Sequence, residues 1–175
     1  YHIDGFRFDL MAIHDIETMN IISERLHAID PAVVIYGEGW AAQAPAYPAE
    51  EIALKANTYM LDGIGAFSDN IRDAVRGPLG CENAGFMDGV AGNKENIEFG
   101  IAGGVEHPQV TVERWTNSPL QHVSYVSCHD DHCLRDRLEE ATKATEAERL
   151  KMVKLAQTAV YTSQGIPFIF AGEEL

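Results

Sequence analysis

"GFRFDL", residues 5–10, is an apolar run that carries one carboxylate, Asp9, near its downstream end. "YGEGW", residues 36–40, repeats the arrangement with Glu38. The alternation of aromatic and other residues in such runs predicts β-strands. An acid inside a core is costly unless it has a partner, so a lone acid at the tip of each predicted strand indicates a use for it there.

The rest of the chain alternates predicted strands with predicted helices. Strands are predicted at residues 3–10, 33–38, 64–69, 122–130 and 166–172, and helices at 15–29, 70–77 and 145–163. Asp15 is a predicted N-cap, and Thr145 with Glu148 forms a predicted capping box. This alternation predicts an α/β fold with a parallel sheet and outer helices. The glycine-rich residues 77–118 break the pattern and are expected to form a functional loop or an excursion.

The composition limits the kind of partner. The 175 residues, 46% of them hydrophobic, suffice for one domain with a sizeable core. The formal net charge of −14 argues against nucleic acid as a partner, because binding phosphates requires a basic surface. No apolar run reaches the roughly 18 residues of a membrane helix, so no membrane partner is expected.

The strand tips suggest a shared site. In parallel α/β folds the carboxyl ends of the strands meet at one edge, so Asp9, Glu38 and Asp130 are expected to converge. Alternation places Arg7 on the same strand face as Asp9, where its charge would keep a carboxylate ionised. Paired carboxylates suit glycoside hydrolysis, in which one attacks the anomeric carbon and the other protonates the leaving oxygen. Trp40 would reduce the solvation of Glu38 or stack on a sugar ring.

The motifs also resemble those of a known family. Three of them are similar to the second, third and fourth conserved regions of the α-amylase superfamily, glycoside hydrolase family 13: "GFRFDLM", "YGEGW" and "VSCHDD". "YHIDGFRFDLMAIHDIETMN" resembles most closely the bacterial type I pullulanases within that family. "FSDNIRDAVRG" and "GIPFIFAGEE" are similar to its sixth- and eighth-strand segments. The resemblance covers essentially the whole chain, with the motifs in the family's order.

The resemblance implies a role for each matching residue. It makes Asp9 the nucleophile and Glu38 the general acid/base of a retaining hydrolase, with Arg7 orienting the nucleophile at the substrate. It makes His129 and Asp130 the pair that grips sugar hydroxyls and favours the distorted transition state.

The resemblance also implies a substrate. Met11 and Trp40 match positions that line the subsites around a branch point. The expected partner is an α-glucan whose α-1,6 links are cleaved, such as pullulan, glycogen or amylopectin. The expected chemistry uses no cofactor, and any calcium is expected elsewhere in a parent protein.

The match with the family is incomplete. The first conserved region, on the third barrel strand, and the "YNWGYDP"-type signature are absent. By the family's order, residues 1–175 correspond to about strands four to eight of a (β/α)8 TIM barrel with their helices. They would be the C-terminal part of a catalytic barrel domain, truncated at both ends, and a full barrel takes about 250 residues. We therefore expect a piece that is inactive alone and self-associates through exposed sheet edges.

Other functions stay open on the residues alone. An α-1,4-acting amylase or an isoamylase-like enzyme of the same superfamily would share these motifs. A non-catalytic glucan-binding homologue would normally lack one of the three acids, all of which are present. A barrel enzyme that binds a divalent metal at its strand ends would need more acids and histidines there.

"CHDDHC", residues 128–133, has the composition of a metal site. Zinc ligands usually come in pairs from separate segments, and a strand-to-helix turn would scatter these side chains, so no metal is expected there. Cys81, Cys128 and Cys133 are odd in number and lack a disulfide framework, which predicts reduced thiols.

Overall fold

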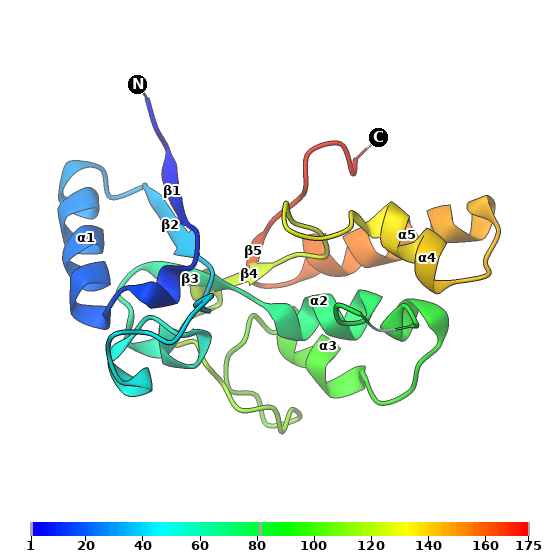
Figure 1. Ribbon diagram of the computed structural model, residues 1–175, viewed down its shortest axis with the longest axis horizontal. Helices are drawn as coiled ribbons and strands as arrows, with labels where there is room; N and C mark the ends of the chain where they lie inside the picture. The colour runs from blue at the N-terminus through cyan, green and yellow to red at the C-terminus, as the bar shows by residue number, and fades with distance from the viewer. Residues whose placement is uncertain (1, 81, 175) are drawn as a thin grey trace.

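The computed structural model describes residues 2–80 and 82–174. Within this part of the chain one sheet contains five parallel strands in chain order: β1 (Gly5–Phe8), β2 (Val34–Gly37), β3 (Ile64–Phe67), β4 (His122–Ser124) and β5 (Ile166–Pro167). Helical segments connect the strands, and the sheet stays open between β1 and β5 (Figure 1). The architecture is a parallel half-barrel, which confirms the predicted partial (β/α)8 fold.

The α-helices of the described residues are α1 (Ile16–Ile29), α2 (Asp69–Arg76), α3 (Lys94–Ile101), α4 (Leu134–Ala141) and α5 (Glu146–Thr162). Short 3₁₀ helices occur at Met11–Ile13, Ala49–Glu51, Lys55–Met60, Gly85–Asp88 and Pro119–Gln121. Helix α1 lies beside β1 and β2, and the other four helices lie together at the opposite end of the molecule (Figure 1). None of these helices combines the length and the apolar character needed to cross a membrane.

Local signals in the sequence explain where the two longest helices begin. The Asp15 side chain caps α1 by accepting a hydrogen bond from the Thr18 backbone N–H at 2.7 Å. Thr145 and Glu148 form the predicted capping box at the start of α5. Gly77 ends α2 with a positive φ of 80°, a conformation that suits glycine.

All five strands are shorter than predicted, β4 and β5 the most. β4 ends at Ser124 because its neighbour β3 stops at Phe67, where the chain enters α2 and offers no further partner. β5 covers only Ile166–Pro167 at the sheet edge, and one more backbone hydrogen bond follows it, from the Phe168 N–H to the Ser124 carbonyl at 2.9 Å. The predicted excursion 77–118 contains α3 in addition to a 3₁₀ turn, so it is more ordered than a loop.

The core forms on both faces of the half-barrel. One cluster lies between the outer face of β2 and β3 and the elements around α1, and includes Met19, Ile35 and Ile64. A second cluster joins α2, α4 and α5. A third cluster covers the inner face and consists mainly of aromatic residues: Tyr36, Trp40, Phe67, Tyr125 and Phe168, with Val123, Cys128 and Ile166. This inner layer lies directly beneath the strand tips that carry the predicted site.

Candidate active site

Arg7 connects the two predicted catalytic carboxylates. Its Nη1 donates to Asp9 and its Nη2 donates to Glu38, so one guanidinium forms an ion pair with each acid. Glu38 is only 3% exposed, whereas the Asp9 side chain is 60% exposed. Burial lowers the pKa of Arg7, but its hydrogen bond with Asp9 and the charges of Glu38 and Asp9 outweigh that effect and raise the pKa above its usual value.

The position of Glu38 depends on the glycines at each side of it. A Cβ on Gly37 would lie 2.7 Å from the Phe8 carbonyl oxygen, and a Cβ on Gly39 would lie 2.6 Å from the Lys55 backbone nitrogen. Such separations are too short for any side chain, so "GEG" lets neighbouring backbone approach on both sides. The Glu38 N–H donates to the Phe8 carbonyl at 3.0 Å, which extends the β1–β2 ladder to the acid itself.

Leu10 provides a second contact to Glu38 that the sequence did not reveal. Its backbone N–H donates to Glu38 Oε2 at 2.7 Å. Leu10 lies in the left-handed region, with φ 45° and ψ 47°, which costs a non-glycine residue about 1–2 kcal/mol. This conformation turns the chain from β1 into the 3₁₀ helix Met11–Ile13 and directs the N–H at the acid.

His129 and Asp130 approach the pair from the loop after β4. His129 Nε2 lies 3.2 Å from Asp130 Oδ1 and 3.7 Å from Asp9 Oδ1. The Asp130 side chain is 76% exposed and therefore open to a ligand. Four of the residues singled out in the sequence thus place polar atoms within 4.8 Å of one another: Asp9, Glu38, His129 and Asp130.

The same four residues are the one described group of histidine, cysteine and acidic side chains close enough to share a metal ion. Arg7 forms ion pairs with both Asp9 and Glu38, and its positive charge opposes a cation between them. The "CHDDHC" segment does scatter its side chains, since Asp131 pairs with Arg76 and His132 lies 3.1 Å from Glu140. The charge of Arg7 therefore disfavours a metal ion among these four side chains.

A cavity of about 390 Å³ opens beside Glu38 and Asp130. Trp40 lines it, next to the acid that it was predicted to shield. Three further lining residues were not singled out from the sequence: Phe67, Arg72 and Tyr125. The alternation in β3 could have indicated Phe67, whereas the approach of α2 to the segment after β4 depends on the tertiary fold.

Met11 does not join this group. Its side chain is fully buried in the outer core cluster, and its sulfur lies close to Gly37 on β2. The chain turns at Leu10 immediately before it, and this turn directs Met11 into the core. Met11 offers no exposed surface in this structure, and its place at a subsite stays a prediction.

The described cysteines are reduced thiols. Cys128 and Cys133 are both free and partly buried, and burial raises the pKa of each thiol above its usual value, which makes both less reactive. The prediction for Cys81 concerns a position outside the described residues.

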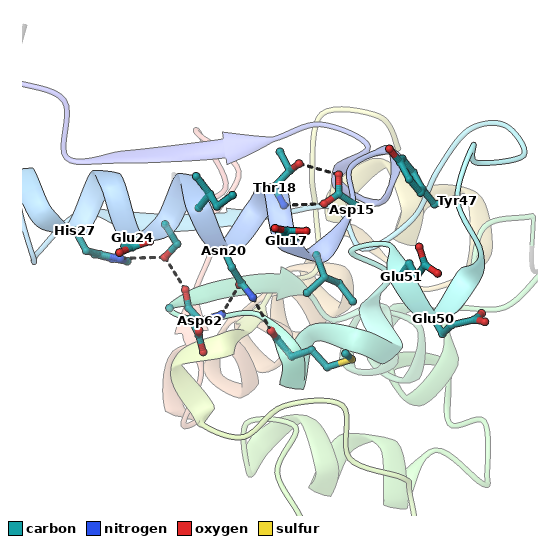
Figure 2. Close-up of a pocket in the computed structure, with 15 residues that line it drawn as sticks. Asp15, Glu17, Thr18, Asn20, Glu24, His27, Tyr47, Glu50, Glu51 and Asp62 are labelled. Carbon is teal, nitrogen blue, oxygen red and sulfur yellow. Dashed lines mark hydrogen bonds between the residues drawn. The ribbon is translucent and has the colours of Figure 1, made fainter.

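A larger cavity, about 1110 Å³, lies elsewhere, between α1 and residues 47–63. Figure 2 shows its acidic lining, which includes Glu17, Glu24, Glu50 and Glu51. Asn20 accepts from the Asp62 N–H at 2.9 Å and donates to the Met60 carbonyl at 3.0 Å. These two hydrogen bonds connect α1 to residues 60–62. None of the four clustered residues, Asp9, Glu38, His129 and Asp130, lines this cavity.

Comparison with known proteins agrees with the geometry. No family model matches the chain. The pullulanase of Bacillus subtilis (strain 168) is 34% identical over 176 residues, which are 99% of this chain and 24% of that protein. The structure of type I pullulanase from B. subtilis str. 168 complexed with maltose matches with a TM-score of 0.92 over 99% of this chain and 24% of that one. This chain is related to the type I pullulanases.

A second structure supports the same relationship. The apo pullulanase from Paenibacillus barengoltzii matches with a TM-score of 0.93 and 45% identity, over 99% of this chain and 27% of that one. The predicted resemblance to type I pullulanases in glycoside hydrolase family 13 is confirmed. The chain spans about a quarter of the length of these pullulanases.

Proposed function

We propose that residues 1–175 carry the catalytic acids of a retaining, pullulanase-type glycoside hydrolase that cleaves α-1,6 links in α-glucans. The observation that carries the proposal is the pair Asp9 and Glu38 held by one arginine at adjacent strand ends. The nearest oxygens of the two acids lie within 4.8 Å of each other. Retaining enzymes hold their carboxyl groups about 5–5.5 Å apart, whereas inverting enzymes leave about 6.5–9.5 Å for a water molecule.

In the proposed mechanism Asp9 attacks the anomeric carbon while Glu38 gives a proton to the departing glycosidic oxygen. A covalent glycosyl-enzyme forms on Asp9, and Glu38 then takes a proton from the water that releases the sugar. Arg7 keeps the two acids at a fixed separation. His129 and Asp130 bind hydroxyls of the sugar being distorted, and Trp40 borders the space beside Glu38. This chemistry requires no cofactor.

The proposed substrate is a branched α-glucan. Structures of the P. barengoltzii pullulanase contain maltotetraose in one case and maltohexaose with α-cyclodextrin in another. The exposed carboxylates of Asp9 and Asp130 suit a neutral, hydroxyl-rich ligand of this class. We also propose that the enzyme prefers α-1,6 over α-1,4 links. We further propose that this chain is the C-terminal part of a catalytic barrel domain.

The test compares Asp9→Asn and Glu38→Gln variants of the full-length protein that contains this chain. We expect each to lower kcat on pullulan by about 10⁴-fold or more, because each removes a group that reacts directly. Products from pullulan, amylose and glycogen would be identified for the unaltered protein. Maltotriose from pullulan supports debranching.

Each remaining result points to a defined alternative. Cleavage of amylose with pullulan untouched would identify an α-1,4-acting enzyme. Glucan binding without any cleavage would identify a non-catalytic homologue. Full activity of Asp9→Asn would rule out Asp9 as the nucleophile. Asp88→Asn, in an exposed turn after α2, is the matched control and should keep its activity.

A further inference from the structure

The floor of the active site links Arg7 to a buried pair of aromatic rings. The guanidinium carbon of Arg7 lies 5.7 Å from the centroid of the Phe67 ring. The Phe67 ring meets the Tyr125 ring edge to face, with centroids 4.8 Å apart and an angle of 62°. Both rings are buried, on β3 and on the segment just after β4. The arginine that holds both acids therefore rests on a packed layer.

A second arginine holds the other end of this layer. Arg72, on α2, donates from Nη1 to the Tyr125 hydroxyl at 2.7 Å, and its guanidinium carbon lies 5.6 Å from the Tyr125 ring centroid. Its Nε donates to Asp73 at 2.7 Å. Burial lowers the pKa of Arg72, but the bond to Asp73 and the surrounding charges raise the pKa overall. Arg72 is thus a cation that anchors the hydroxyl end of the tyrosine.

We propose that Phe67 and Tyr125, anchored by Arg72, form an aromatic column that positions Arg7 and thereby sets the separation of Asp9 and Glu38. These are positioning residues, since they act through Arg7. The inference rests on the proposed function, because it assigns the column a role in that reaction.

The physical argument concerns the freedom of Arg7. Its long side chain has many rotamers. It forms ion pairs with two acids at the ends of different strands, and each acid could pull the guanidinium away from the other acid. A ring face beneath the guanidinium attracts the cation and restricts it to one plane. Small displacements of reacting groups reduce catalysis strongly, so loss of the ring should be visible in kcat.

The experiment measures kcat and KM on pullulan for the full-length protein carrying Phe67→Leu, Tyr125→Leu or Tyr125→Phe. We expect the two leucine variants to lower kcat by about 10- to 100-fold, with KM changed less than about threefold. Tyr125→Phe keeps the ring but removes the hydroxyl that accepts from Arg72, so it should lower kcat only about threefold, as loss of the Arg72 anchor does. Arg72→Gln, which alters a side chain at the edge of the cavity, should lower kcat by about threefold or more.

The matched control is Phe99→Leu, which removes an equally buried ring that packs on Trp115 in the outer core. A purely structural role predicts that the leucine variants resemble Phe99→Leu, with lower stability and an unchanged pH profile of kcat/KM. Positioning predicts that only the column variants change the pH profile of kcat/KM, because only they alter how Arg7 contacts the two acids. The other titratable groups facing the pair, His129, Asp130 and Cys128, are the same in all variants.

The outcomes separate the two proposals. If the unaltered protein does not cleave pullulan, the proposed function is wrong and this inference falls with it. If the protein is active and the column variants behave like Phe99→Leu, only this inference is overturned. If the leucine variants do not fold, an unchanged kcat in Arg72→Gln overturns it.

Discussion

Arg7 and Leu10 hold Glu38 through both of its carboxylate oxygens. Arg7 uses its side chain, whereas Leu10 uses a backbone N–H that reaches the acid because the residue is left-handed. Strained backbone of this kind is frequent at functional sites, where the surrounding structure maintains it. At the scale of single residues, burial also lowers the pKa of a group outside this site, His122 on β4.

His122 should make the stability of the protein depend on pH. Burial, together with the nearby charge of Lys55, lowers its pKa to about 4. The unfolded chain takes up this proton near pH 6.5 and the folded chain only near pH 4, so the unfolded state binds more protons in between. We expect this residue to reduce the free energy of unfolding by about 2 kcal/mol as the pH falls from 7 to 5.

The measurement is urea unfolding of the protein at several pH values, compared with a His122→Gln variant. The variant should lose most of this pH dependence, whatever its absolute stability. Equal slopes for the two proteins would show that His122 titrates normally in the folded state. His107→Gln, at an exposed position outside the sheet, is the control for loss of a histidine.

At the scale of elements, backbone hydrogen bonds hold the turn after β2 on both sides. Lys55 donates its backbone N–H to the Gly39 carbonyl at 2.8 Å, and Ala12 donates to the Trp40 carbonyl at 3.3 Å. Two 3₁₀ helices, Met11–Ile13 and Lys55–Met60, thus hold the "GEGW" segment from either side. The glycines permit this approach, and the acid between them is fixed as a result.

Gly39→Ala should therefore disturb both stability and catalysis. The added Cβ would lie 2.6 Å from backbone atoms of Lys55, which cannot move aside as a flexible side chain could. We expect a loss of about 1–3 kcal/mol in the free energy of unfolding, measured by urea, and a lower kcat because Glu38 shifts. Gly65→Ala is the control, since its nearest neighbour would lie at 3.3 Å. A Gly39→Ala protein as stable and active as that control would contradict the steric argument.

At the scale of the whole molecule, the half-barrel leaves two sheet edges and part of the inner aromatic face uncovered. β1 and β5 each pair on one side only. Phe6 on β1 is 36% exposed, and nearby Ile3 and Val34 are exposed as well. Unpaired strand edges with apolar side chains favour association with other chains.

We predict that residues 1–175, produced alone, self-associate through the β1 edge and do not cleave pullulan. Phe6→Lys places a charge on this edge and should lower the average mass measured by light scattering. Ile29→Lys at the end of α1, where the side chain is already exposed, is the control and should leave the mass unchanged. A monodisperse monomer of the unaltered chain would refute the prediction.

The sequence alone indicated the five strands, the helices α1, α2 and α5, and the order in which the acids appear. Caps at Asp15 and Thr145, strand alternation and the placing of Asp9, Glu38 and Asp130 at strand tips are local signals, so they could be read directly. These signals predicted a parallel sheet and the acids that meet at its edge, and the resemblance to a known family implied that the sheet is part of a barrel.

Only the tertiary structure decided how those residues are held. The left-handed turn at Leu10, the burial of Met11 and the column from Arg72 to Arg7 join segments that lie up to about sixty positions apart. Local sequence patterns do not predict such contacts, because the contacts depend on how helices and strands pack against one another. The sequence therefore predicts which groups are present at the site, and packing determines their separation and orientation.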